Sequence, residues 1–110
     1  MTVNELADIL NARIDVLADG EREISSGYCG DFLSNVMGKA PADSAWFTVM
    51  SNVNVCAVAS LTDCAVVVVL CEGTEPDPAL TERAKQNEVN LILTGLPVYE
   101  AAVETSRHLG

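Results

Sequence analysis

The sequence predicts an α/β fold, in which a mostly parallel β-sheet with flanking helices forms a single small domain over residues 1–110. The first observation is the uninterrupted apolar run from Ala65 to Leu70, which is typical of a strand covered on both faces, as in parallel sheets. The second is another apolar run, Ala45 to Met50, separated from the first by a segment long enough for a crossover between parallel strands. A chain of 110 residues can bury roughly two thirds of its unfolded surface in one core.

The N-terminal quarter predicts a helix followed by strands. Thr2 and Glu5 have the spacing of a capping box, and the apolar residues that follow predict a helix from Val3 to Leu10. The segment from Arg13 to Val16 alternates polar and apolar residues, as a half-exposed strand does. An Asp-Gly turn precedes a second extended segment, Glu23 to Tyr28, so the two segments form either a hairpin or two separate strands.

The middle of the chain predicts a loop, a helix and a crossover. Gly27 to Asp31 forms a flexible connection, and Asp31 can cap a helix that carries Phe32, Leu33, Val36 and Met37 on one face. Gly38 is expected to end that helix. The segment Asn52 to Leu61 alternates as a strand would, but we predict a helix because the crossover between two buried parallel strands needs one.

The C-terminal part predicts two further units of strand and helix. Ala65 to Cys71 is a strand, and Asp77 followed by Pro78 marks the start of a helix that runs to about Asn87. Leu91 to Leu93 is a short strand, followed by a turn and a final helix that places Val98, Ala101, Ala102, Thr105 and Leu109 on one face. The predicted element order is α-β-β-α-β-α-β-α-β-α.

Charge and hydropathy exclude several classes of partner. Sixteen acidic and six basic residues give a formal net charge of -10, which repels nucleic acid and anionic membrane surfaces. No stretch reaches the roughly 18 apolar residues of a membrane span, and the N-terminus lacks the pattern of a signal peptide. The sequence therefore predicts a cytoplasmic protein that binds neither nucleic acid nor membranes.

The cysteines and the single histidine do not predict a catalytic or metal site. Cys29, Cys56, Cys64 and Cys71 contain no CxxC pair, and we expect reduced, buried structural thiols. Cys29 is the exception: beside Gly30 and a helix start, we expect it to be exposed and somewhat acidified. His108 is expected on the surface. The sequence thus predicts no enzyme activity, no metal and no cofactor.

The candidate ligand site follows from the predicted sheet. Ligands of open parallel sheets bind where the strands end, in loops that offer free backbone donors. These loops are rich here in small and amide side chains, which turns alone also explain. The candidate ligand-binding residues are Gly27, Ser51, Asn52, Asn54, Gly73 and Thr94.

Four segments in this order, GYCGDFLSNV, WFTVMSNVNVCAVAS, LCEGTEPDPALTERA and TGLPVYEAA, resemble the DRTGG-domain family over Ile24 to Leu109. That family includes stand-alone bacterial proteins, regulatory segments of phosphotransacetylases, inserts of CBS-domain pyrophosphatases and relatives of the HPr kinase N-terminal domain. The motif that names the family is not kept: its Asp-Arg pair falls near Asn52-Val53, and of its Thr-Gly-Gly only Gly73 remains. An anion site that relies on that arginine would be lost.

The resemblance implies a noncatalytic regulatory fold, usually dimeric. The leading hypothesis is a regulatory or ligand-sensing module that forms a homodimer through an apolar surface and binds a small molecule of unspecified identity. The alternative is a protein-interaction or assembly subunit of a metabolic complex, without a ligand of its own. Similar stand-alone members encoded beside iron-only hydrogenase subunits hint at a partner enzyme of that kind. A thiol redox or iron-sulfur protein, suggested by the four cysteines, is the third hypothesis.

Overall fold

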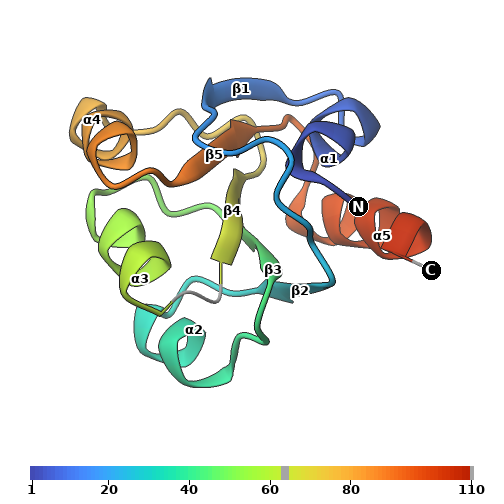
Figure 1. Cartoon of the computed structure of the whole chain (residues 1–110), viewed down its shortest axis with the longest axis horizontal. Helices are drawn as coiled ribbons and strands as arrows, with labels where there is room; N and C mark the ends of the chain where they lie inside the picture. The colour runs from blue at the N-terminus through green and yellow to red at the C-terminus, as the bar shows by residue number, and fades with distance from the viewer. Residues whose placement is uncertain (63–64, 110) are drawn as a thin grey trace.

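The computed structural model describes residues 1–62 and 65–109, which form five helices and five strands in the predicted order (Figure 1). The elements are α1 (Val3–Ile9), β1 (Arg13–Val16), β2 (Ser26–Cys29), α2 (Leu33–Lys39), β3 (Ser44–Thr48), α3 (Asn54–Thr62), β4 (Ala65–Leu70), α4 (Pro78–Gln86), β5 (Asn90–Leu93) and α5 (Val98–Leu109). The strands form one sheet in the order β1-β5-β4-β3-β2. β2, β3, β4 and β5 are parallel, and β1 is antiparallel to β5. The predicted α/β class is therefore confirmed.

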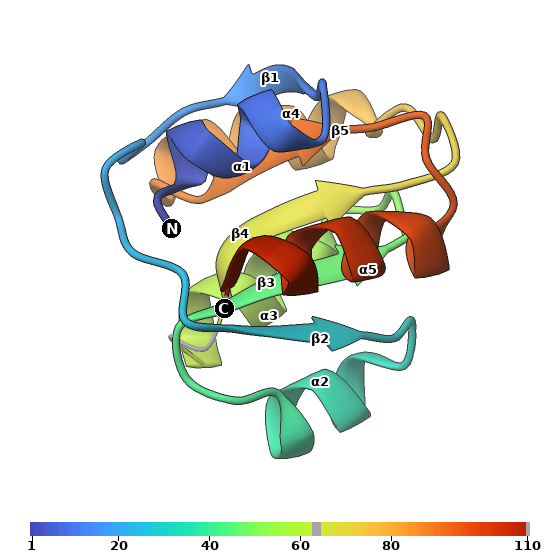
Figure 2. The ribbon, with the colours of Figure 1, turned by 90° about the vertical axis from the view of Figure 1, so that its right-hand side faces the viewer.

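The sheet lies between two layers of helices (Figure 2). α1 and α5 pack on one face, whereas α2, α3 and α4 pack on the other. β4 lies in the middle of the sheet and is buried along its whole length. Its side chains alternate between the layers, with Val67 and Val69 facing α1 and α5, and Val68 and Leu70 facing the other three helices. The Val-rich strand thus contributes side chains to the apolar core on each face of the sheet, as expected of a strand that is covered on both faces.

Two local predictions are confirmed by the geometry. Thr2 Oγ1 accepts a hydrogen bond from Glu5 N at 3.1 Å, and Glu5 Oε1 accepts one from Thr2 N at 3.0 Å, which completes the capping box of α1. The ambiguous segment after β3 is the helix α3, and its buried residues Val55, Cys56 and Ala59 join the core on that face. The predicted helix is therefore confirmed, although the apolar and polar residues of this segment alternate as in a strand.

β1 and β2 are two separate strands and not a hairpin. They lie at opposite edges of the sheet, and the chain between them crosses its amino-terminal side (Figure 2). This crossing segment is fixed by Ile24, which is buried against α1 and whose N–H donates to Met1 O at 2.7 Å. Burial of Ile24 thus helps to hold the crossing segment against the α1 side of the sheet.

Three expectations around α2 are wrong. Gly27 belongs to strand β2 rather than to a loop, and Asp31 does not cap α2, because its carboxylate accepts from Thr48 Oγ1 at 2.6 Å and Val49 N at 3.1 Å. Gly38 lies inside the helix, which ends at Lys39, since Pro41 disfavours helical geometry in the residue before it.

The side chains of α2 also differ from the one-sided pattern that we expected. Val36 is buried and Leu33 packs against the core, but Phe32 and Met37 are 76% and 54% exposed. Cys64, expected to be a buried thiol, lies outside the described residues. No helix among residues 1–62 and 65–109 has both the length and the apolar character required to cross a membrane.

Candidate ligand-binding site

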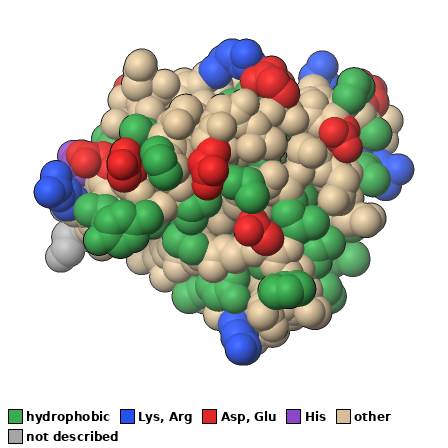
Figure 3. Space-filling view, turned by 180° about the vertical axis from the view of Figure 1, so that it is seen from behind, with side chains coloured by type: hydrophobic (Ala, Val, Ile, Leu, Met, Phe, Trp, Pro, Cys, Tyr) green, Lys and Arg blue, Asp and Glu red, His purple; other side chains and the backbone are tan. Residues whose placement is uncertain are grey.

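The carboxyl ends of the four parallel strands point to one side of the molecule, as the arrows in Figure 2 show. Figure 3 views this side directly. The structure divides the six predicted site residues into three groups: one near the start of α3, one between the loops after β4 and β5, and Gly27 by itself.

Ser51, Asn52 and Asn54 connect elements and line neither the hollow beside Gly73 nor the one beside Gly27. Ser51 Oγ donates to Asp77 Oδ1 at 3.3 Å, and Ser51 O accepts from Asp77 N at 3.0 Å, which joins this loop to the start of α4. Asn52 Oδ1 accepts from Asn54 N at 3.0 Å and so stabilises the start of α3. The polar groups of Ser51 and the Asn52 side-chain oxygen are therefore engaged in hydrogen bonds within the fold.

Gly73 and Thr94 do meet at this edge. Gly73 N donates to Thr94 O at 3.1 Å, and Gly73 has a positive φ of 72°, which a glycine adopts without strain. Both residues line a hollow of about 250 Å³, together with Asn11, Arg13, Thr74, Glu75, Leu93 and Gly95. The guanidinium of Arg13 is paired with the Glu75 carboxylate at 2.7 Å. The positive charge in this hollow is thereby offset.

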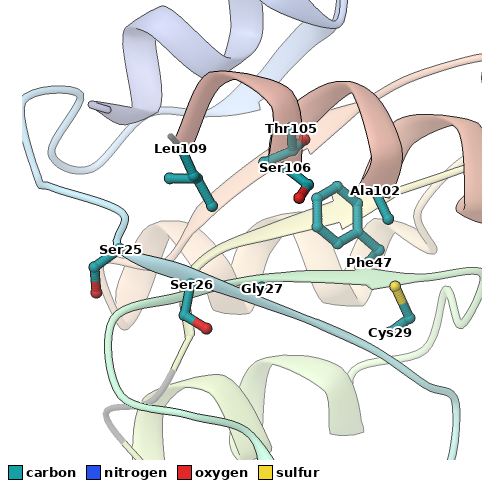
Figure 4. Close-up of a pocket in the computed structure, with 9 residues that line it drawn as sticks. All are labelled: Ser25, Ser26, Gly27, Cys29, Phe47, Ala102, Thr105, Ser106 and Leu109. Atoms are coloured by element: carbon teal, nitrogen blue, oxygen red, sulfur yellow. The ribbon is translucent and has the colours of Figure 1, made fainter.

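Gly27 lies elsewhere, in a separate hollow that we name the β2–α5 pocket (Figure 4). This pocket has a volume of about 340 Å³ and lies between the edge strand β2 and helix α5. Its lining consists of small, hydroxyl-bearing and apolar residues: Ser25, Ser26, Gly27, Cys29, Phe47, Ala102, Thr105, Ser106 and Leu109. The lining contains no charged side chain.

The pocket exists because small residues face each other across it. A Cβ at Gly27 would lie 3.5 Å from the Phe47 ring, so the absent side chain leaves space above a buried aromatic surface. Thr105 Oγ1 already donates to Ala101 O at 2.8 Å. Within the described chain, the Ser106 hydroxyl has no hydrogen-bond partner and lies beside the Phe47 ring, whereas the Ser26 side chain points away from α5, on the opposite face of β2 from Cys29 (Figure 4).

The thiol of Cys29 at this pocket is exposed, as expected, but it is not acidified. Partial burial and then the Asp31 carboxylate raise the pKa of Cys29 above its ordinary value. The expectation failed because the neighbouring carboxylate is negative and α2 begins only at Leu33, with Phe32 as its N-cap. Cys29 therefore contributes a neutral thiol to the lining at pH 7.

The other described cysteines are buried structural thiols, as predicted. Burial raises the pKa of Cys71 to about 12, with further contributions from neighbouring acidic groups. Burial also raises the pKa of Cys56, partly offset by a hydrogen bond from Asn87. No group of three or more potential metal ligands is present in residues 1–62 and 65–109.

Sequence reasoning named Gly27 but missed its partners, Phe47 and the residues of α5. The signal was present in the last helix, where Ala102, Thr105 and Ser106 are small residues on or beside the predicted inner face. Small side chains on a buried helix face indicate a close approach or a hollow. Which strand lies opposite that face depends on the strand order, which the sequence does not specify.

Comparison with known proteins supports the fold. No protein-family model matches the chain, and no curated protein matches its sequence. Among solved structures, the chain is similar to the CBS and DRTGG domains of the regulatory region of Clostridium perfringens pyrophosphatase, a crystal structure complexed with the activator diadenosine tetraphosphate. The match has a TM-score of 0.71 at 14% sequence identity, and it covers 98% of this chain and 45% of that chain. The chain thus shares its fold with part of a regulatory region and spans less than half of that crystallised chain.

Proposed function

We propose that this chain is a noncatalytic regulatory domain that senses a small uncharged ligand in the β2–α5 pocket. The observation that carries the proposal is the pocket itself, in which the unpartnered Ser106 hydroxyl lies near a buried aromatic ring, without any charged side chain in the lining. Pockets for small molecules combine apolar walls with a few polar groups in this way. The fold shared with a regulatory region supports a regulatory role.

The expected ligand differs from the polyanionic activator of the pyrophosphatase. The net charge of -10 repels phosphate groups, and the pocket offers no cation to bind them. At the sheet edge, the hollow beside Gly73 has a guanidinium already paired with Glu75. Isothermal titration with diadenosine tetraphosphate should therefore give no heat of binding, and measurable binding would contradict the uncharged ligand class.

The ligand class can be tested by NMR with a library of matched charged and uncharged aromatic fragments. We expect uncharged fragments to shift the amide signals of Gly27, Cys29 and Ser106. Gly27→Val should abolish these shifts, because its methyl groups fill the space above Phe47. Gly38→Ala is the matched control, since a Cβ there meets nothing within 4 Å. Fragments that bind both variants equally, or a turnover abolished by a change in one loop residue, would refute the proposal.

We also expect this module to form a homodimer. Phe32 and Met37 are exposed large apolar residues at α2, and hydrophobic side chains gather over the lower part of the face in Figure 3, where α2 lies. Exposed apolar patches of this kind mark interaction surfaces. Native mass spectrometry should show a dimer that Phe32→Glu dissociates, whereas a monomeric wild-type protein would contradict the expectation.

The same exposed residues favour the second candidate function, an assembly subunit that uses this apolar surface to bind a partner enzyme. The two functions differ in the part of the molecule that they need. Gly27→Val should remove ligand sensing and leave assembly intact, whereas Phe32→Glu should do the reverse.

A further inference from the structure

The two edges of the sheet differ in their protection against another strand. At β1, Arg13 is ion-paired with Glu75, and Asp15 accepts a hydrogen bond from Thr81 Oγ1 at 2.7 Å, so charged side chains guard this edge. Strand β2 has the sequence Ser-Gly-Tyr-Cys and carries neither charge nor proline. Natural proteins block free edges with charges, prolines or bulges. β2 is therefore an unguarded edge.

The hydrogen-bond register shows which backbone groups this edge presents. Ser26 N donates to Asp43 O at 3.3 Å and Gly30 N donates to Phe47 O at 3.2 Å, so these alternate residues bond inward to β3. In a parallel pair the intervening residues point the other way. The N–H and C=O groups of Gly27 and Cys29 therefore point outward, and no other strand of the described chain pairs with them.

The unguarded edge and the β2–α5 pocket share the same residues. Gly27 and Cys29, whose backbone groups point outward, also line the pocket between β2 and α5. A strand added beside β2 would direct every second side chain toward the α5 layer of the sheet. One such side chain would lie next to the pocket opening, where Gly27 has no side chain to exclude it (Figure 4).

We infer that an extended peptide segment of a partner protein adds to β2 as a further strand and inserts one uncharged side chain into the β2–α5 pocket. Backbone hydrogen bonds supply the affinity in this mode of recognition, and a pocket for alternate side chains supplies the selectivity. The inference rests on the proposed function in one respect, because it assigns a ligand class to the same pocket.

The homodimer that we expect uses α2 and leaves β2 free, and the net charge favours a basic partner segment over a second copy at this edge. Two copies that pair through β2 would bring together two molecules of net charge -10. A segment with basic residues beside its uncharged pocket residue would be attracted by the same field. The partner is therefore an extended, net basic peptide without proline at the pairing positions.

The test begins with a phage-displayed library of random octapeptides, selected on the full chain. We expect the selected peptides to be net basic and to share one apolar position. Synthetic versions of one selected peptide are then N-methylated at each residue in turn. Strand addition predicts that methylation at alternate positions weakens binding by roughly tenfold or more, because each affected position loses a backbone donor. A methylation profile without this alternation overturns the inference.

A matched pair of protein variants tests the same edge. Cys29→Pro removes an outward N–H, whereas Cys29→Val has similar volume and keeps it. We expect roughly tenfold weaker peptide binding for the proline variant than for the valine variant, with thermal melting as the check on folding. Equal binding by the two variants overturns the inference.

Three further outcomes distinguish this inference from its premise and from pairing with a second copy. If no peptide is selected but uncharged fragments still shift Gly27, the pocket binds small molecules and the peptide inference fails alone. If neither binds, both proposals fail. If the chain by itself forms a dimer that Cys29→Pro dissociates and Cys29→Val does not, the occupant of the edge is a second copy and the inference is overturned.

Discussion

At the scale of single residues, Asn90 holds the crossing segment before β2 against the sheet. Its side chain is 3% exposed, and Asn90 Oδ1 accepts from Ala18 N at 2.8 Å and Asp19 N at 2.9 Å. Asn90 Nδ2 donates to Asp19 O at 3.1 Å and Val66 O at 3.0 Å. One amide therefore satisfies the backbone of a loop and of β4 at the same time.

Replacement of the Asn90 side chain should lower the stability of the fold. We expect Asn90→Leu to lower the free energy of unfolding by about 3 kcal/mol, because buried or half-buried backbone groups lose their partners. Urea denaturation measures the change. Asn35→Ala is the control, since Asn35 is exposed on α2 and should cost under about 0.5 kcal/mol, apart from its effect on helix propensity. A loss for Asn90→Leu equal to that of the control would refute this role.

The thiol of Cys71 predicts a pH dependence of stability. Its pKa is raised in the folded chain to about 12 from an ordinary value of 9.0, so the unfolded chain releases this proton first as the pH rises. The contribution to stability is complete below pH 9 and is lost between pH 9 and about 12.

Urea denaturation between pH 7 and 10.5 tests this sign. Above pH 9 the wild-type stability should fall more steeply than that of Cys71→Ser, by up to about 1.4 kcal/mol per pH unit. We expect Cys71→Ser to have a lower free energy of unfolding at every pH. The comparison uses the slope of the free energy of unfolding against pH, which a constant difference in stability does not change. Parallel slopes for the two proteins would show that the thiol titrates normally.

At the scale of elements, α1 has only seven residues and depends on its cap. We expect Thr2→Ala to lower the free energy of unfolding by about 1 kcal/mol, because Glu5 N loses its acceptor. Chemical denaturation measures this loss. Thr74→Ala is the matched control, since among the described residues the Thr74 hydroxyl makes no hydrogen bond. Equal losses would mean that tertiary packing alone holds α1 in place.

Elements with a strong local pattern were predictable, and elements decided by distant contacts were not. The buried strand β4 and the cap of α1 follow from residues within one segment. The role of Asp31 could not be inferred in this way, because it bonds to the end of β3, 17 residues away in the chain. The hairpin alternative likewise stayed open until the burial of Ile24 was known.

The candidate site shows the same division. The loops after β4 and β5 do meet, as the rule for parallel sheets predicts, and Gly73 and Thr94 share a hollow there. The β2–α5 pocket was missed because it pairs Gly27 with Ser106, which are close only when β2 is the edge strand on the side of α5. Strand order is a property of the whole sheet and leaves little trace in any one segment.

At the scale of the whole molecule, repulsion between like charges opposes folding. The described residues contain four ion pairs, which are few beside sixteen acidic residues. Sodium chloride screens this repulsion, so stability should rise on the order of 1 kcal/mol between 0.01 and 0.5 M salt. Thermal denaturation across this range measures the effect. The doubly neutralised variant with Asp8→Asn and Glu82→Gln, both exposed, should gain less from salt than the wild type. A stability that falls with salt would show that the ion pairs dominate.

The position of β1 has a consequence for the time at which this molecule can fold in a cell. β1 pairs with β5, and α1 contacts α5, so within this domain the elements that are synthesised earlier wait for partners that are synthesised later. β2, β3 and β4 can associate earlier, since each follows its neighbour along the chain. Throughout translation the growing chain would therefore carry an unpaired first helix and strand, whose apolar side chains are open to chaperones. Closure of the sheet awaits synthesis of the final strand and helix.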